Sequence, residues 1–328
     1  MRVIARTGRE EIAMVYIAEL SEGRQIEFVE SVQPPLPREE KWVLIISTLF
    51  GCPIGCLMCD AGGGYRGKLS KDEIFSQIDY LVKKRFPDGH VPVSKFKIQF
   101  ARMGEPSFNS HVLEVLEELP RRYDAPGLLP SLSTIAPHGT DGFFERLLQI
   151  KQRQYSDGRF QLQFSIHTTD IHLRDRLIPV KKWDFAKIAN YGERFHDKDN
   201  RKITLNFALA KEAPLDSSVL SRYFSPEKFL VKITPLNPTH RAQENRLCSH
   251  IDPHHLHGDC SVVQELRAAG FEVIQSIGEV EENRIGSNCG QYVTRHLQAE
   301  ADISGGYDCC SRPAKDRKLH TLGHLGSI

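Results

Sequence analysis

The segment from Phe50 to Gly67 reads FGCPIGCLMCDAGGGYRG and contains three cysteines, Cys52, Cys56 and Cys59, with C-x3-C-x2-C spacing. A glycine and a proline flank the first cysteine and favour a bent backbone. Three thiolates on one loop can ligate three irons of a [4Fe–4S] cluster and leave the fourth iron open to a substrate or cofactor. Structural zinc sites usually show paired C-x2-4-C knuckles, so zinc binding is the weaker interpretation of this triplet.

From residue 41 onward, short apolar strands alternate with amphipathic helices. The pattern predicts strands at 42–46, 95–101, 129–134, 160–166, 202–209 and 229–234. Helices are predicted between them, and the first begins with a capping box formed by Ser70 and Glu73. Six βα units in a row predict an α/β fold with a parallel sheet closed into a barrel or partial barrel. In such barrels the chemistry lies at the carboxyl ends of the strands, and the cysteine loop follows the first strand.

The two ends of the chain differ from this repeating pattern. Residues 14–19 and 25–30 predict a hairpin of two short strands, and the prolines at 34–37 (PPLP) predict a stiff connector. We therefore expect three parts: a two-strand N-terminal extension at 1–40, a partial barrel at 41–276 and a C-terminal segment at 277–328.

Composition limits the classes of protein to consider. The chain has 328 residues and 40% hydrophobic content, enough for one barrel-sized domain with small additions. It has no apolar run of about 18 residues and no signal-peptide pattern, so we expect no membrane association and a cytoplasmic location. Eight cysteines without such a signal indicate reduced thiols. The net charge of +1 gives no overall field that would attract nucleic acid.

The cysteine triplet resembles the signature of the radical S-adenosylmethionine (SAM) superfamily. Residues 64–70 (GYRGKLS) resemble, more specifically, the RlmN/Cfr family of radical SAM methyl synthases. The resemblance implies a partial (β/α)6 radical SAM barrel, with a [4Fe–4S] cluster on Cys52, Cys56 and Cys59 and SAM as the second cofactor. It also implies a one-electron donor such as flavodoxin or ferredoxin. Met58 stands where most members have an aromatic residue, and its apolar side chain can still cover the cluster.

Polar residues that follow successive predicted strands resemble the SAM-binding segments of the family. They are Gly104 and Glu105 in the GEP motif, Ser133, the run Ser165-Ile166-His167, and Asn237. The resemblance implies that the Glu105 carboxylate binds the amino group of SAM and that the others form hydrogen bonds with SAM. Each residue alone is equally compatible with a polar cap on a barrel mouth.

Cys289, in the segment N-C-G-Q, resembles the methyl-accepting cysteine of RlmN-like enzymes. A nucleophilic thiolate there would take a methyl group from one SAM. A deoxyadenosyl radical from a second SAM would activate that methyl group for addition to an sp2 carbon. Tethering the carbon source to the protein makes the addition effectively intramolecular. The alternative for Cys289 is a small buried apolar residue.

The chain departs from the family at two positions. Ile45 stands where the family has a cysteine that resolves the covalent protein–substrate adduct, and Asn206 stands where it has an acidic residue. Isoleucine has no thiol, so a thiol elsewhere or a different reaction outcome is needed. Four cysteines remain, namely Cys248, Cys260, Cys309 and Cys310. They are interpreted as unpaired thiols, as part of a small zinc site in the histidine-rich loop, or as the source of a replacement resolving thiol.

We therefore expect a radical SAM C-methyltransferase that methylates an sp2 carbon through S-methylcysteine. The substrate is left open between an adenine in RNA and a small heteroaromatic molecule. One alternative is a radical SAM enzyme of another class that removes hydrogen directly from its substrate, which Ile45 favours. The other is a non-catalytic module that contains a metal and binds RNA or a protein partner.

Overall fold

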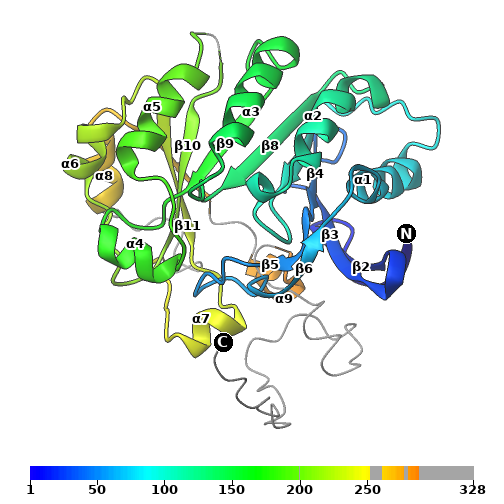
Figure 1. Cartoon of the computed structure of the whole chain (residues 1–328), viewed down its shortest axis with the longest axis horizontal. Helices are drawn as coiled ribbons and strands as arrows, with labels where there is room; N and C mark the ends of the chain where they lie inside the picture. Colours follow the sequence, from blue (N-terminus) through cyan, green and yellow to red (C-terminus); the bar gives the residue numbers. More distant parts are fainter. Residues whose placement is uncertain (199, 252–260, 277–279, 288–328) are drawn as a thin grey trace, which may run out of the picture.

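The structure is a computed structural model, and it describes residues 1–198, 200–251, 261–276 and 280–287. Its main feature is a curved ten-stranded sheet in the order β1-β2-β3-β4-β7-β8-β9-β10-β11-β12 (Figure 1). The strands from β4 to β12 run parallel, and the first three pair antiparallel. The strand bounds are Arg2–Arg9, Ala13–Glu19, Gln25–Ser31, Lys41–Ile46, Lys95–Phe100, Leu128–Thr134, Gln161–Ser165, Ile203–Leu209, Phe229–Pro235 and Glu272–Gln275.

Most of the helices cover the outer side of the sheet, while α7 and α9 lie at one end of it beside β5 and β6 (Figure 1). Their bounds, from α1 to α9, are Lys71–Arg85, His111–Arg122, Asp141–Gln154, Ile171–Leu177, Phe185–Phe195, Ser217–Tyr223, His240–Glu244, Ser261–Ala268 and Val280–Ile285. All six predicted βα units are present. The predicted capping box is also present, since the Ser70 side chain accepts from the Glu73 N–H and the Glu73 side chain accepts from the Ser70 N–H. The fold is therefore the expected α/β fold with a mostly parallel, barrel-like sheet.

Three further features were not predicted because their sequences lack an apolar pattern. β1 is a polar edge strand whose burial pattern is mostly exposed or half-buried. β12 has only four residues. Inside the cysteine region, β5 (Leu49–Cys52) and β6 (Gly63–Lys68) form a separate two-stranded antiparallel sheet. The cysteine segment is thus a short hairpin with a long loop.

The predicted N-terminal hairpin exists, and it continues the main sheet. β2 and β3 pair along their full length, and β3 pairs antiparallel with β4. The apolar residues of β2 are almost fully buried, including Val15, Tyr16 and Ile17. Their burial explains why the hairpin packs against α1 and the first parallel strand.

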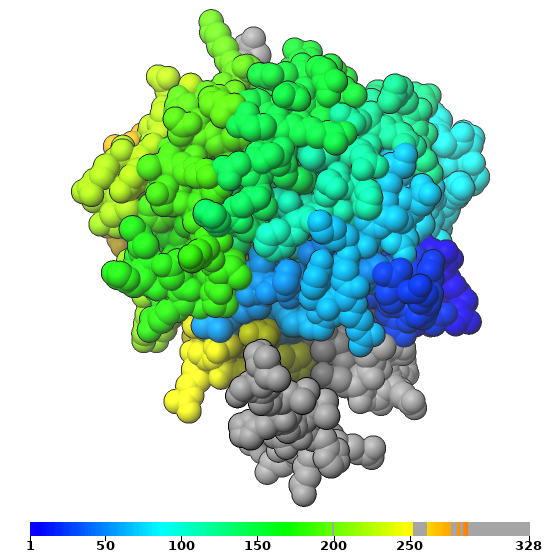
Figure 2. Space-filling view, viewed as in Figure 1, coloured from blue at the N-terminus to red at the C-terminus, as the bar shows by residue number. Residues whose placement is uncertain are grey.

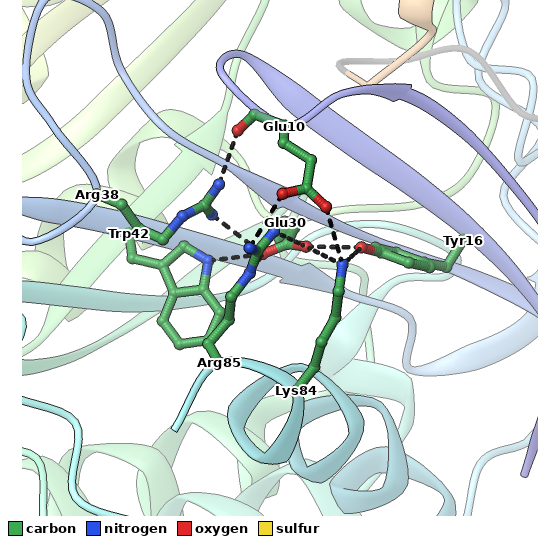
Figure 3. A network of polar contacts seen from close by, with 7 residues as sticks. All are labelled: Glu10, Tyr16, Glu30, Arg38, Trp42, Lys84 and Arg85. Atoms are coloured by element: carbon green, nitrogen blue, oxygen red, sulfur yellow. Dashed lines mark hydrogen bonds and ion pairs between the residues drawn. The ribbon is translucent and has the colours of Figure 1, made fainter. Parts of the chain in front are cut away.

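A buried carboxylate, Glu30 on β3, joins the N-terminal strands to α1 (Figure 3). The Glu30 residue is 1% exposed. Tyr16 Oη donates to its carboxylate at 2.6 Å, and two nitrogens of Arg85 on α1 donate at 2.9 and 3.1 Å. The remaining donors come from a second strand, the connector and α1, namely Trp42, Arg38 and Lys84. Because every donor converges on one carboxylate, its charge fixes how the N-terminal strands sit on α1.

This network predicts an acid-sensitive contribution to stability. Burial raises the pKa of Glu30, but the hydrogen bonds from Arg85 and Tyr16 and the charges of Arg85 and Lys84 outweigh it, giving about 2. An unfolded glutamate has a pKa of about 4.3. The folded-state pKa is lower, so the contribution is present above about pH 5 and is lost as the pH falls toward 2.

Replacement of Glu30 by glutamine should therefore lower the free energy of unfolding at pH 7 by about 3 to 5 kcal/mol, because Arg85 keeps a charge without its carboxylate partner. The difference between the two proteins should shrink between about pH 5 and pH 3. Urea unfolding at a series of pH values measures this. Glu19→Gln, which breaks the exposed Arg2–Glu19 pair, is the matched control and should cost less than about 1 kcal/mol. Equal pH dependence of the native protein and Glu30→Gln would contradict the assignment.

Candidate active site

A cavity of about 370 Å³ lies at the carboxyl ends of the parallel strands. The β5–β6 hairpin, α7 and α9 lie at this end of the sheet (Figure 1). The cavity brings together most of the site residues predicted from the sequence: Cys52, Cys56, Cys59, Gly104, Glu105, Ser133, Ser165, His167 and Asn237. These residues lie at the carboxyl ends of different strands or in the loops that follow them. Their convergence therefore depends on the parallel order of the sheet.

The three cysteines line the cavity together. Gly51 before them has φ +72°, and a Cβ there would lie 2.6 Å from the Gly64 carbonyl oxygen, so only glycine fits this turn. Burial raises the pKa of Cys52, and burial followed by the neighbouring Cys52 raises the pKa of Cys56 to about 12. Such thiols become thiolates when they ligate a positively charged centre.

The cysteine loop is held by residues around α7, which Figure 2 shows beside it on the surface. The Arg241 N–H donates to Asp60 at 2.9 Å, and the Thr239 hydroxyl donates to the Met58 carbonyl at 2.8 Å. Asn245 donates to the Leu57 carbonyl at 3.1 Å. Because these contacts engage backbone and acidic groups of the loop, the thiols remain directed toward the cavity.

No group of three or more His, Cys, Asp or Glu side chains in the described part of the chain is arranged to hold a single metal ion. In a [4Fe–4S] cluster each ligating thiolate binds a different iron, so the thiolates do not need to converge on one ion. Three cysteine thiols from one loop that share one cavity are a donor set that fits such a cluster.

Glu105 is a buried carboxylate at the cavity wall. The pKa of Glu105 lies above its usual value, because the effect of burial outweighs the lowering by hydrogen bonds from Thr134, Ile135 and Ser107. The Ile135 N–H donates to one carboxylate oxygen at 3.0 Å, and the Ser107 hydroxyl donates to the other at 2.7 Å. A buried carboxylate held by neutral donors has the chemistry to receive a cationic group such as an ammonium.

Gly104 precedes this carboxylate and has φ +94°. A Cβ at Gly104 would lie 2.4 Å from the Leu49 side chain, so the loop needs glycine to approach the β5–β6 hairpin. The close approach places Glu105 and the cysteines on neighbouring walls of the same cavity.

His167 presents a neutral ring to the cavity. Burial and then the charge of Arg174 lower its pKa to about 4. The Ala208 N–H donates to Nδ1 of His167 at 3.1 Å, which assigns the ring proton to Nε2. His167 can therefore donate one hydrogen bond to a bound ligand. Its φ of +67°, unusual for a residue with a side chain, accompanies this placement at the end of β9.

Ile166 differs from the other predicted SAM-binding residues. Its side chain is fully buried, it does not line the cavity, and its N–H donates to the Asn206 carbonyl at 2.9 Å. Ser133, Ser165 and Asn237 do line the cavity. Ile45, at the position of the family's resolving cysteine, lines it too.

The sequence analysis missed a basic region on the inner side of the sheet. Lys232 lines the cavity, as does Gln99 on β7. Lys97 lies two residues before Gln99 in the strand KFKIQF, where lysines and glutamine alternate with buried apolar residues. Burial, followed by the charges of Lys232 and Lys41, lowers the pKa of Lys97 to about 7. The period-two pattern was the available signal, since it places Lys97 and Gln99 on the same face of β7.

Cys289 lies outside the described residues, as do Cys260, Cys309 and Cys310. Cys248 is described; it is exposed and is not among the cavity-lining residues. The segment that leads to Cys289 does reach the cavity, because Ser276 and Glu282 line it. No helix in the described part of the chain is long and apolar enough to cross a membrane.

A solved structure with a similar fold is known. The chain matches the crystal structure of a radical SAM methyltransferase from Sphaerobacter thermophilus with a TM-score of 0.64 and 19% sequence identity. The match covers 88% of this chain and 80% of that one. The chain therefore shares the fold of that protein, in agreement with the expected partial barrel.

Comparison of sequences then gives the nearer resemblance. No protein-family model matches the chain. The chain is 27% identical over 244 residues to a probable dual-specificity RNA methyltransferase RlmN of Desulfitobacterium hafniense, covering 71% of this chain and 66% of that protein. It is 26% identical over 221 residues to RlmN of Anaeromyxobacter dehalogenans, covering 65% and 57% respectively. The resemblance to the RlmN/Cfr family is thus confirmed, although the chain spans less than two thirds of the length of these relatives. A [4Fe–4S] cluster and SAM are the cofactors of that family.

Proposed function

We propose that this chain is a radical SAM methyltransferase that acts on RNA and adds carbon to an sp2 centre through an S-methylated Cys289. The observation that carries the proposal is the cavity, where Cys52, Cys56 and Cys59 share one space with Glu105 and His167. The similarity to RNA methyltransferases of the RlmN type supports RNA as the substrate.

In this proposal each site residue has its own role. Cys52, Cys56 and Cys59 would hold the cluster, and Glu105 would receive the amino group of SAM. When bound, the cluster supplies the electron for reductive cleavage of SAM, and SAM supplies the methyl group. Cys289 would hold the carbon unit as a thioether and present it to the substrate. Addition to the substrate would then be effectively intramolecular. A one-electron donor such as flavodoxin or ferredoxin remains an expectation.

Anaerobic reconstitution with iron and sulfide, followed by incubation with SAM, a reductant and RNA, tests the proposed function. We expect about four irons per chain, SAM cleavage and a methylated adenine in the RNA. An RNA transcript that lacks the modified nucleotide serves as the control. A protein that binds the cluster and cleaves SAM without methylating RNA would contradict the proposed substrate. A protein that binds no cluster would contradict the enzyme class and favour a non-catalytic module.

A second candidate is a radical SAM enzyme of another reaction class that removes hydrogen directly from its substrate. Ile45 favours it, because this cavity residue has no thiol to resolve a protein–substrate adduct. Under the first candidate, a thiol pair formed by Cys309 and Cys310, or by Cys248 and Cys260, would take over that step. Turnover that is normal in both double alanine variants would favour the second candidate.

Glu105 offers a direct test of the SAM site. Replacement by glutamine keeps the shape and removes the charge, so the affinity for SAM should fall roughly 10- to 100-fold, as expected for loss of a charged hydrogen bond. The iron content should stay at the native level, because Glu105 is not a cluster ligand in this proposal. Isothermal titration of the reconstituted proteins measures the affinity. Glu117→Gln, which alters a surface ion pair of α2 with Arg146, is the matched control. Native SAM affinity in Glu105→Gln would remove Glu105 from the site.

A further inference from the structure

Arg102 links three distant parts of the chain at the cavity. It directly precedes the segment Met103-Gly104-Glu105 and lines the cavity. Nη1 of Arg102 donates to the Ser287 carbonyl at 2.8 Å, and Nη2, the second terminal nitrogen, donates to the Gly286 carbonyl at 2.9 Å. The second nitrogen also contacts the Glu27 carboxylate of β3 at 2.6 Å. Both side chains of this Arg102–Glu27 pair are fully buried.

These contacts hold the end of α9. Gly286 and Ser287 immediately follow the helix, and the Ser287 residue is 1% exposed. Carbonyl groups at a helix end lack partners within the helix, and here a buried guanidinium supplies them. α9 also packs against β1 and β2, and Glu282 from this helix lines the cavity. The N-terminal strands and the Met103–Glu105 loop therefore hold the same short segment.

The position of Ser287 constrains Cys289, which comes two residues later in the sequence. Two residues of fully extended chain span at most roughly 7 Å, so fixing Ser287 limits where the Cys289 thiol can be. A methyl carrier must meet both its methyl donor and the substrate carbon within a narrow range of geometry. An anchor at Ser287 would therefore bear directly on methyl transfer.

We propose that Arg102 is a positioning residue that anchors the backbone at Gly286–Ser287, that Glu27 fixes the orientation of its guanidinium, and that methylation of Cys289 depends on this anchor. The inference rests on the proposed methyl-carrier function of Cys289, but the anchor itself concerns described residues alone. It gives the N-terminal strands a part in the active site, because Glu27 belongs to β3. Buried carbonyls and a buried carboxylate that share one guanidinium need its fork geometry, which a lysine does not reproduce.

The test combines Arg102→Lys, which keeps the positive charge beside Glu27, with Arg102→Met, which removes it. Amide hydrogen exchange of peptides covering 280–288 should speed up at least 10-fold in both variants, because the anchoring hydrogen bonds are lost. The S-methylated fraction of Cys289, measured by peptide mass spectrometry after incubation with SAM, should fall at least 10-fold. Iron content should remain native, since Arg102 is not a cluster ligand.

Arg9→Gln is the matched control, since it removes the exposed ion pair between Arg9 and Glu281 on the same helix. Surface pairs of this kind contribute little, so exchange and methylation should stay within about twofold of the native protein. Native exchange rates at 280–288 in a folded Arg102→Lys protein would overturn the proposed anchor. If Arg102→Met does not fold, Arg102→Lys alone decides. Faster exchange in a chain whose native form is never methylated at Cys289 would instead leave the anchor standing and contradict the proposed function.

Discussion

Replacement of any one of Cys52, Cys56 and Cys59 by alanine should abolish the iron–sulfur cluster. Iron content should fall from about four per chain to well below one, together with the visible charge-transfer absorbance and all SAM cleavage. The loss should be similar in the three variants, because each thiolate binds its own iron and a cluster with one missing ligand is exposed to solvent and oxidation. Anaerobic reconstitution with iron and sulfide analysis measures the effect.

The surroundings of the loop explain why no neighbour should substitute. Asp60 accepts hydrogen bonds from the backbone N–H groups of Arg241 and His240. Met58 offers only a weakly ligating thioether. Cys248→Ala is the matched control, because this thiol is exposed and does not line the cavity, and the variant should keep a full cluster. A full complement of iron in any of the three cavity variants would refute the cluster assignment.

The parts of the fold that the sequence predicted are those in which burial follows a simple pattern. Strands covered on both faces are apolar, as in β4, and helices such as α1 begin with a clear capping box. The edge strand β1 and the glycine-rich β6 carry no such pattern, because much of their surface faces solvent. Their pairing is set by neighbours that are distant in sequence or by a turn.

Some residues of the candidate site could likewise be predicted from the sequence, and others could not. Residues at strand ends could be predicted from their order, because parallel strands bring their carboxyl ends to one edge. Arg102 could not, since its partners Glu27 and Ser287 lie 75 residues before it and 185 residues after it. The hydrogen bond from the Ile166 N–H to the Asn206 carbonyl could not be predicted either, because it depends on the register between neighbouring strands. The proposed division of the chain at residues 40 and 276 stays a prediction.

Cys289 provides the decisive test of the proposed chemistry. Cys289→Ala should retain the cluster and SAM binding, because the cluster ligands and Glu105 are unchanged. Methylated product should fall to the background level, and slow SAM cleavage uncoupled from product should remain. The reason is that the thiol is the only proposed carrier of the carbon, and neither alanine nor the serine of Cys289→Ser supplies an adequate nucleophile at neutral pH.

Three measurements on the same preparations separate the possible outcomes. Peptide mass spectrometry should find one added methyl group on the Cys289 peptide of the native protein, and none on the corresponding peptide of Cys289→Ser. Glu117→Gln, which alters a surface ion pair of α2, should methylate RNA at the native rate, which excludes a general effect of substitution. If Cys289→Ala still methylates RNA, the methyl group does not pass through this thiol, and direct hydrogen abstraction from the substrate becomes the better account of the cavity and of Ile45.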